Sequence, residues 1–236
     1  MTSTLRAANP ICVALDFDDP ARVRDVAAAT SDHVGIFKIG LTAYTSGGPE
    51  LVRELAARHP VFLDLKFHDI PAQVQGSVRA VAATGALYTT VHASGGPAMV
   101  AAAVEASGNS LTVLAVTVLT SLDDWTLDAV GMKGPAGDAV VRLAGLALAA
   151  GADGLVCSPL EVEKLRSEFG ARRDGGPLLV VPGIRSQTDA HGDQKRTLSA
   201  TEALAAGADV IVVGRPITAA PDPARAALRL LEEIGT

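Results

Sequence analysis

Short apolar runs alternate with alanine-rich amphipathic segments along almost the whole chain of 236 residues. The apolar runs are typical of strands buried on both faces, and the amphipathic segments have the length of helices. We predict strands at 11–16, 34–39, 61–66, 87–92, 111–117, 153–157, 178–181 and 209–213. We predict helices at 20–30, 48–58, 71–84, 97–106, 137–150, 159–169, 199–206 and 223–233. This rhythm indicates parallel strands that are joined by crossover helices.

The number of strand–helix units decides between two α/β architectures. Eight units favour a closed (β/α)8 TIM barrel, and we predict one catalytic domain over residues 1–236. An internal repeat supports the count, since Ala150–Asp153 and Ala206–Asp209 both read Ala-Gly-Ala-Asp where a helix gives way to a strand. Glycine there allows the left-handed conformation that ends many helices. The alternative is a doubly wound open sheet, but no G-x-G-x-x-G motif follows the first predicted strand.

Composition argues against several classes of partner. Aromatic residues make up 3% of the chain and the formal net charge is −6, whereas nucleic-acid-binding proteins usually carry a basic face and stacking aromatic side chains. No apolar run approaches the roughly 18 residues of a membrane span, and the N-terminus lacks the apolar core of a signal peptide. The cysteines, Cys12 and Cys157, lie in apolar runs without the spacing of a zinc site. We therefore expect a cytoplasmic protein with no metal, membrane or nucleic-acid partner.

One segment combines a strand with three charged residues. Val61 to Leu65 has the character of the third strand, Asp64 and Lys66 lie two positions apart, and Asp69 follows in the next loop. Side chains alternate across a strand, so Asp64 and Lys66 should point into the barrel while Leu65 packs outward. They fall at the C-terminal end of the strand, where TIM barrels place their catalytic residues. The alternative is a structural Asp–Lys pair that fills the barrel.

Further charges on the first two strands argue against a purely structural pair. Asp16 ends the first predicted strand, and Lys38 lies in the second, again among apolar residues. Together with Asp64, Lys66 and Asp69 they form a set of alternating charges on three adjacent strands. Opposite neighbours favour the ionised form of each group, so Lys66 should be protonated and the aspartates charged. Such a network can hold sugar hydroxyls and deliver a proton.

A second group of motifs follows the last two predicted strands. Gly183 and Arg185 come after the seventh strand, and Gly214 and Arg215 come after the eighth. The loops after these strands form the usual phosphate site of TIM barrels. Glycine lets backbone N–H groups approach a phosphate, and arginine offers a forked donor. We predict a phosphate site here, with ordinary turn chemistry as the alternative.

A polar loop and a hydroxyl complete the candidate set. Residues 185–198 are polar and include Gln194. A loop of this length in a barrel is usually a lid or a binding loop. Thr120 follows the fifth strand, where its hydroxyl can hydrogen-bond a polar ring or simply cap a turn.

Taken together, these motifs resemble the orotidine 5′-phosphate decarboxylase family in its bacterial form. The signature residues are Asp64, Lys66, Asp69, Ile70 and Pro71, although the D-x-K-x-x-D part alone is shared by a wider suprafamily. The other matching segments follow in the family's order and are 15–16, 38–40, 116–121, 182–185, 192–196 and 213–216. The resemblance covers nearly the whole chain. It implies decarboxylation of orotidine 5′-monophosphate to UMP and CO2, the last step of de novo pyrimidine synthesis, without a cofactor.

The resemblance also implies roles for individual residues. Lys66 is similar to the proton donor to C6 of the pyrimidine, and Asp64 to the residue beside the substrate carboxylate. Asp69 would come from the partner subunit of a homodimer, so that the active site is shared. Gln73 departs from the family pattern, in which threonine commonly stands and reaches the partner's ribose. The implied substrate-binding residues are Asp16, Lys38, Asp69, Ile70, Gln73, Thr120, Arg185, Gln194, Gly214 and Arg215, and Lys38 also belongs to the implied catalytic set.

Two alternative functions stay open at this point. One is a Mg²⁺-dependent sugar-phosphate lyase or aldolase of the same suprafamily, in which the aspartates would hold the metal ion. Sensitivity to a chelator separates it from the decarboxylase. The other is a non-catalytic nucleotide-binding barrel, which would bind UMP but release no CO2 from orotidine monophosphate. An inward Asp-Lys-Asp array disfavours this second alternative, because mere binding does not need one.

Overall fold

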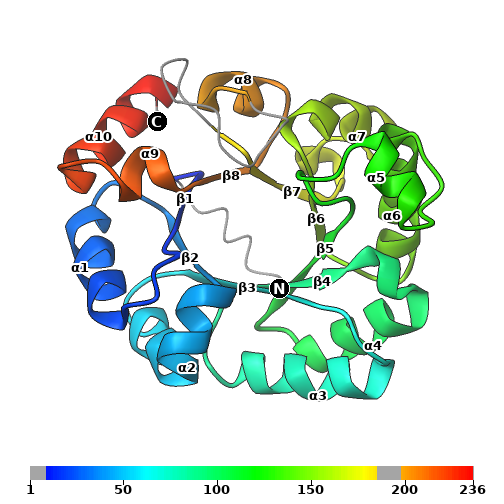
Figure 1. Cartoon of the computed structure of the whole chain (residues 1–236), viewed down its shortest axis with the longest axis horizontal. Coiled ribbons are helices and arrows are strands. Elements are labelled where there is room, and N and C mark those ends of the chain that lie inside the picture. Colours follow the sequence, from blue (N-terminus) through cyan, green and yellow to red (C-terminus); the bar gives the residue numbers. More distant parts are fainter. Residues whose placement is uncertain (1–8, 185–197, 236) are drawn as a thin grey trace.

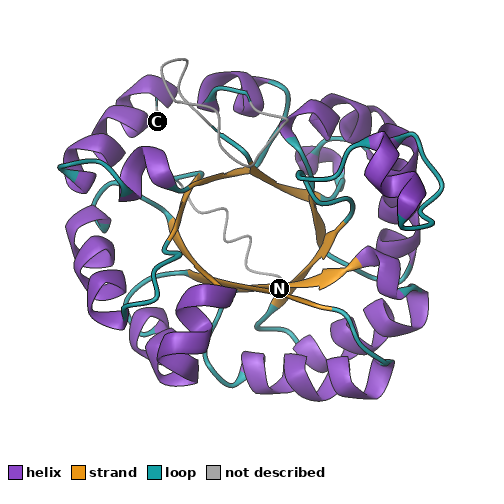
Figure 2. Cartoon of the chain, in the orientation of Figure 1, coloured by secondary structure: helices purple, strands orange, loops and turns teal. Residues whose placement is uncertain are grey.

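The computed structural model of the chain describes residues 9–184 and 198–235, in which eight strands form a closed barrel. Each strand runs parallel to the next, and β8 pairs with β1 to close the barrel. The helices form a ring around it (Figure 1), and Figure 2 separates the inner strands from the outer helices by colour. The predicted (β/α)8 TIM barrel is therefore confirmed, and the open sheet is excluded.

The strands lie close to the predicted positions. They are β1 (Ile11–Ala14), β2 (Ile36–Gly40), β3 (Val61–Phe67), β4 (Tyr88–His92), β5 (Thr112–Val116), β6 (Gly154–Val156), β7 (Leu178–Pro182) and β8 (Val210–Val213). Continuous apolar runs in the sequence predicted these strands. Each strand is covered by helices on its outer face and by core residues on its inner face, so neither face is polar.

The helices are less regular than predicted. They are α1 (Pro20–Thr30), α2 (Leu41–Ala56), α3 (Pro71–Ala82), α4 (Pro97–Ser107), α5 (Asp124–Ala129), α6 (Ala136–Ala149), α7 (Val162–Phe169), α8 (Ala200–Ala205), α9 (Arg215–Thr218) and α10 (Pro223–Ile234). Helix α2 starts earlier than predicted, because a kink at Gly48, with φ 63°, hides its first part from a periodicity argument. Helices α5 and α9 were not predicted, since they are too short for a periodic pattern. None of the described helices is both long and apolar enough to cross a bilayer.

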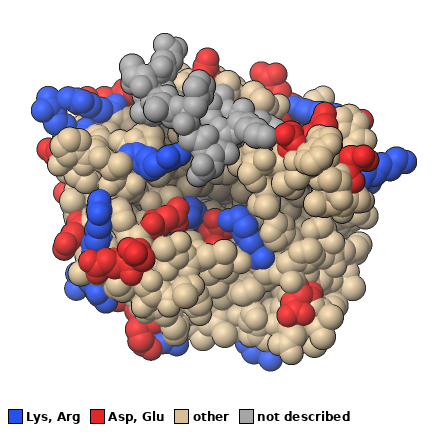
Figure 3. Space-filling model, viewed as in Figure 1, with Lys and Arg blue, Asp and Glu red and all other residues tan. Residues whose placement is uncertain are grey.

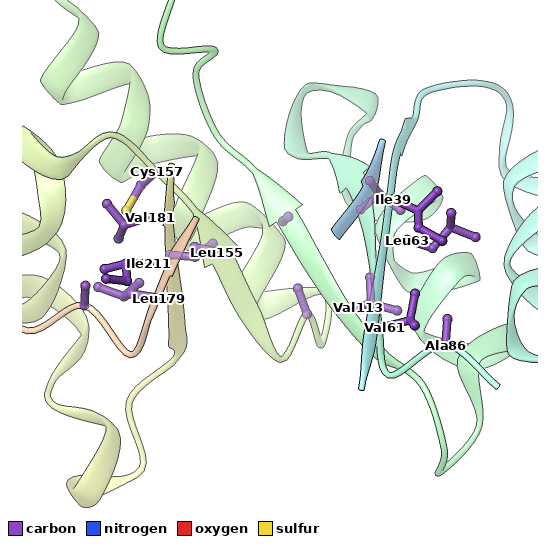
Figure 4. Packing of buried hydrophobic residues seen from close by; sticks show 14 of the residues in the cluster. Ile39, Val61, Leu63, Ala86, Val113, Leu155, Cys157, Leu179, Val181 and Ile211 are labelled. Carbon is purple, nitrogen blue, oxygen red and sulfur yellow. The ribbon is translucent and has the colours of Figure 1, made fainter. Parts of the chain in front are cut away.

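Apolar side chains fill two separate layers. The larger layer lies between the strands and the helices, and Figure 4 shows part of it, including Leu63, Leu179 and Ile211. The smaller layer lies inside the barrel and includes Phe62 and Leu114. Leu63 and Phe62 are neighbours in β3 yet belong to different layers, as strand alternation requires. The inner layer forms an apolar floor beneath the C-terminal ends of the strands.

The repeated Ala-Gly-Ala-Asp segments have a structural role. Gly151 and Gly207 end their helices with φ of 94° and 109°, a region that favours glycine. Each following aspartate accepts a backbone N–H from a neighbouring strand. Asp153 Oδ2 accepts from Val113 at 3.0 Å, and Asp209 Oδ2 accepts from Leu179 at 2.8 Å. These carboxylates therefore fix the N-terminal ends of the strands and are not candidates for catalysis.

Candidate active site

A cavity of about 630 Å³ opens at the C-terminal ends of the strands. Viewed from this side, acidic and basic side chains gather around a hollow in the middle of the face (Figure 3). The charged and hydroxyl-bearing residues that line the cavity are Asp16, Arg22, Lys38, Asp64, Lys66, Thr120, Arg215 and Thr218. The cavity has the position that TIM barrels use for catalysis.

Four charged side chains form a continuous row of ion pairs that runs from the segment after β1 across β2 to β3. Lys38 Nζ lies 2.8 Å from Asp16 Oδ1 and 3.8 Å from Asp64 Oδ2. The second contact of Asp64 Oδ2 is Lys66 Nζ, at 2.8 Å. Lys38 and Asp64 have side chains only 10% exposed, whereas Lys66 is 30% exposed at the end of the row. The buried pair therefore anchors an ammonium group that faces the cavity.

The two buried members of this row are held in their ionised forms. Burial favours the neutral form of Lys38, but the charges of Asp16 and Asp64 outweigh it and raise the pKa of the lysine. Burial likewise opposes ionisation of Asp64, but Lys66 and Lys38 outweigh it and lower the pKa of the carboxyl. Opposite neighbours therefore dominate over desolvation, as the alternating order of charges predicted.

Glycine is needed at the end of β2 for this row to form. A Cβ atom on Gly40 would lie 2.5 Å from Asp16 Oδ1 and 3.0 Å from Lys38 Nζ. Any larger residue would therefore push the carboxylate and the ammonium group apart. The ion pair between Asp16 and Lys38 therefore needs glycine at position 40 for its lack of a side chain, not for its backbone flexibility.

The backbone of β3 departs from a regular strand at Lys66. Leu63 pairs with Thr89 and Phe67 pairs with Val91, so three residues of β3 stand opposite one residue of β4. Within this bulge Lys66 adopts φ 52°, a left-handed conformation that costs a non-glycine residue about 1–2 kcal/mol. Strain of this kind persists where surrounding contacts enforce it, and it is common at functional sites.

Despite the bulge, the predicted directions of the Asp64, Leu65 and Lys66 side chains are found. Asp64 and Lys66 both line the cavity, and Leu65 packs against the outer core, as strand alternation predicted. The irregular backbone could not be read from the sequence, because nothing in the segment Asp64–Phe67 demands a positive φ.

The motifs after the last two strands lie at the same cavity. Gly183, which has φ 89°, and the segment 214–216 line its wall. Helix α9 begins at Arg215, directly after the glycine that follows β8. Thr120 also lines the cavity, from the loop after β5. Arg185 and Gln194 lie outside the described residues, so the structure places only part of the predicted phosphate site.

Three predicted site residues do not join the row within one chain. Asp69, Ile70 and Gln73 are exposed. Asp69 Oδ1 accepts the backbone N–H of Ile70 at 2.7 Å, and among the described residues no ion pair connects Asp69 to Lys66. Within one chain the described ion pairs therefore join Asp16, Lys38, Asp64 and Lys66 but not Asp69, which lies beyond the end of β3.

The sequence analysis missed Thr90, Arg22 and Thr218, of which Thr218 lines the cavity from the end of α9. Thr90 is fully buried in β4 and hydrogen-bonds both Asp64 and Lys66. It stands in the run Tyr88-Thr89-Thr90-Val91-His92, where one threonine among other polar residues gives no distinctive signal. Arg22, on α1, lines the cavity with its guanidinium 4.6 Å from the ring centre of Phe17, and no pattern pointed to it.

The cavity offers chemistry based on fixed charges. Among the described residues, no group of three or more His, Cys, Asp or Glu side chains is arranged to hold a metal ion. The two aspartates of the row each contact lysine instead. A preorganised ammonium group in such a place can stabilise negative charge that develops on a bound molecule, and it can donate a proton.

Comparisons with known proteins identify the family. The sequence model of the Orotidine 5′-phosphate decarboxylase / HUMPS family matches residues 9–230. The orotidine 5′-phosphate decarboxylase of Anaeromyxobacter sp. (strain K) is 54% identical over 224 residues, which are 94% of this chain and 97% of that protein. This chain belongs to the orotidine 5′-phosphate decarboxylase family.

Other members agree in sequence and in structure. The orotidine 5′-phosphate decarboxylase of Thermobifida fusca is 51% identical and aligned over 96% of both chains. The crystal structure of orotidine 5′-phosphate decarboxylase from Lactobacillus acidophilus superposes with a TM-score of 0.84 at 35% identity, covering 97% of this chain and all of that one. The predicted resemblance is confirmed over nearly the whole chain.

Proposed function

We propose that this chain decarboxylates orotidine 5′-monophosphate to UMP and CO2, using its own side chains and no cofactor. The observation that carries the proposal is the row of ion pairs from Asp16 to Lys66, whose last ammonium group faces the cavity. Family membership supports the same reaction.

Lys66 has two tasks in the proposed mechanism. The bond from C6 of the pyrimidine to the carboxylate breaks, CO2 leaves, and the electron pair stays on C6. The ammonium group of Lys66 stabilises this pair electrostatically and then donates a proton to C6, which leaves a neutral amine that solvent reprotonates. Asp64 keeps Lys66 in position from 2.8 Å and presents negative charge to the departing carboxylate. Asp16 and Lys38 hold the ribose hydroxyls, and Thr120 contacts the ring.

The phosphate group is remote from the bond that breaks, so its contacts serve catalysis by binding energy. We assign the phosphate to Gly214 and Arg215, together with Arg185 and Gln194. Contacts far from the reacting atoms can position the ring and exclude water from it.

Arg215→Ala should therefore reduce kcat/KM for orotidine monophosphate by about 10-fold to 100-fold, since a charge-assisted hydrogen bond to phosphate is lost. Steady-state kinetics measure the effect. Arg229→Ala is the matched control, because Arg229 is an exposed arginine of α10 that is not among the described residues lining the cavity. An Arg215 variant with the parent's kcat/KM would contradict the assignment of the phosphate.

We also propose a homodimer in which Asp69 of each chain completes the partner's site. The support is the exposed position of Asp69 next to Ile70, an apolar residue that is 63% exposed beside the active site. Ile70 and Gln73 would then contact the partner's substrate.

Mixing two inactive variants tests the shared site. Lys66→Ala and Asp69→Ala should each be nearly inactive alone. After subunit exchange, random pairing should restore about one quarter of the parent's activity, because half of the dimers then hold one site with both residues intact. The activity of the mixture is compared with that of each variant at equal total concentration. Absence of recovery, with subunit exchange verified by mass spectrometry, would contradict sharing.

A spectrophotometric assay tests the reaction itself. Mixing the protein with orotidine monophosphate should lower the absorbance of the pyrimidine as CO2 is released, at the same rate with and without EDTA. Loss of activity in EDTA would favour the Mg²⁺-dependent lyase or aldolase. Binding of UMP without CO2 release would favour the non-catalytic barrel.

The remaining proposals concern the whole chain. We propose that residues 1–236 form one catalytic domain, supported by a family match over residues 9–230. We propose that it acts in the cytoplasm on a small phosphorylated substrate, without membrane or nucleic-acid partners. The net charge of −6 and the scarcity of aromatic residues support the expected absence of a nucleic-acid partner.

A further inference from the structure

We propose that Thr90 is a positioning residue of this site, because its single hydroxyl group ties the carboxylate of Asp64 to the strained backbone of Lys66. The inference rests on the proposed function and deepens it. Thr90 does not line the cavity and acts on a substrate only through its two neighbours.

The hydroxyl of Thr90 makes two hydrogen bonds of opposite sense. It donates to Asp64 Oδ1 at 2.9 Å, and it accepts the backbone N–H of Lys66 at 2.9 Å. Thr90 has no exposed surface, so water does not compete for these contacts. A hydrogen bond sheltered from water is stronger, and its loss leaves a buried group unsatisfied.

The acceptor role of Thr90 follows from the bulge in β3. Three residues of β3 stand opposite one residue of β4, so the ladder between Leu63 and Phe67 is interrupted. The N–H of Lys66 needs another acceptor, because a buried backbone donor is rarely left unpaired. The Thr90 side chain supplies it and thereby holds the left-handed conformation at Lys66.

The donor role of Thr90 orients the carboxylate. With Oδ1 of Asp64 bound to the hydroxyl, Oδ2 faces Lys66 Nζ at 2.8 Å and Lys38 Nζ at 3.8 Å. One side chain thus fixes both the backbone from which Lys66 projects and the carboxylate to which its ammonium group is bound. Without Thr90 the ammonium group keeps its charge but loses its defined place in the cavity.

The neighbouring Thr89 provides a matched control. It is equally buried, and its hydroxyl also makes a hydrogen bond in the same strand, donating to the backbone carbonyl of Leu63 at 3.1 Å. It contacts neither Asp64 nor Lys66 through that hydroxyl. Replacing either threonine removes one buried hydroxyl group and its hydrogen bonding. Only the hydroxyl of Thr90 contacts the charged row.

The test compares Thr90→Val, Thr90→Ser and Thr89→Val. Thr90→Val keeps the size of the side chain and should reduce kcat by about 100-fold, the loss expected for a reacting group displaced by about 1 Å. The KM for the substrate and the Kd for UMP should stay within about threefold of the parent, since ground-state binding is retained. Thr90→Ser should restore kcat, and Thr89→Val should keep the parent's kcat at a lower Tm.

Several results would overturn the inference. They are an unchanged kcat in Thr90→Val, a loss in Thr90→Ser equal to that in Thr90→Val, or a loss that disappears when rates are expressed per UMP-binding site. If Thr90→Val does not fold, Thr90→Ala is assessed by the same criteria. An inactive parent protein would refute the proposed function alone. Crystal structures then decide the inference, with the Asp64–Lys66 contact of 2.8 Å expected to lengthen in the Thr90 variant and an unchanged contact overturning it.

Discussion

Lys66→Ala should reduce kcat for orotidine monophosphate by about 10⁴-fold or more, because the variant loses both a proton donor and a preorganised cation. Of the two lysines in the charged row, Lys66 is the more exposed at the cavity, with a side chain 30% exposed against 10% for Lys38. Affinity for UMP should change little, because the proposed ribose and phosphate contacts lie elsewhere. The expected result is therefore a folded protein that binds nucleotide and does not turn over.

A surface lysine provides the control for this variant. Lys164 Nζ lies 2.8 Å from Asp138 Oδ1, the same separation as in the Lys66–Asp64 pair, but both side chains are largely exposed. Lys164→Ala should keep the parent's kcat. Turnover close to that of the parent in Lys66→Ala would remove the basis of the proposed mechanism.

Asp64→Asn should also have a large effect, lowering kcat by about 10²-fold to 10³-fold. Its carboxylate Oδ2 lies 2.8 Å from Lys66 Nζ and 3.8 Å from Lys38 Nζ. Without the negative charge, two ammonium groups face a neutral amide, and the buried Lys38 loses part of its compensation. Asp138→Asn removes the carboxylate of the surface pair and should leave kcat unchanged. Equal kcat values for Asp64→Asn and the parent would show that catalysis does not need the negative charge of Asp64.

The same variant should change how stability depends on pH. Burial raises the pKa of Asp64, but Lys66 and Lys38 outweigh it, so that the folded pKa lies below that of the unfolded chain. The resulting stabilisation is complete above the unfolded pKa and is lost as pH falls through the folded one. The free energy of unfolding of the parent, measured in urea, should therefore decline below about pH 4. Asp64→Asn should lack this part of the decline, and an identical pH profile would contradict it.

The barrel could be predicted because its physical requirements appear directly in the sequence. Runs such as Val210–Val213 are apolar on both faces, and the glycines before β6 and β8 mark helix ends. Asp16, Lys38, Asp64 and Lys66 stood out for the same reason, as charges inside apolar strands. Strand order and alternation then sufficed to bring them to one cavity.

What could not be predicted depends on contacts between strands. The positive φ of Lys66 arises from the register shift between β3 and β4, and the role of Thr90 depends on that shift. A threonine in a strand has no distinctive signal, since β-branched residues are common there. Asp69 lies in the loop after β3, as predicted, and its place in a partner's site stays a prediction. The short helix α9 and the kink in α2 were not predicted, because each is a local feature of one or two turns.

The most direct test of the central claim is to run the reaction in D2O with EDTA and to examine the product by proton NMR. We expect UMP in which the C6 proton signal is absent, because the proton that replaces the carboxylate comes from an ammonium group that exchanges with solvent. CO2 should be released in equal amount. Recovery of unchanged orotidine monophosphate under these conditions would contradict the claim that this protein decarboxylates it with its own side chains and without a metal ion.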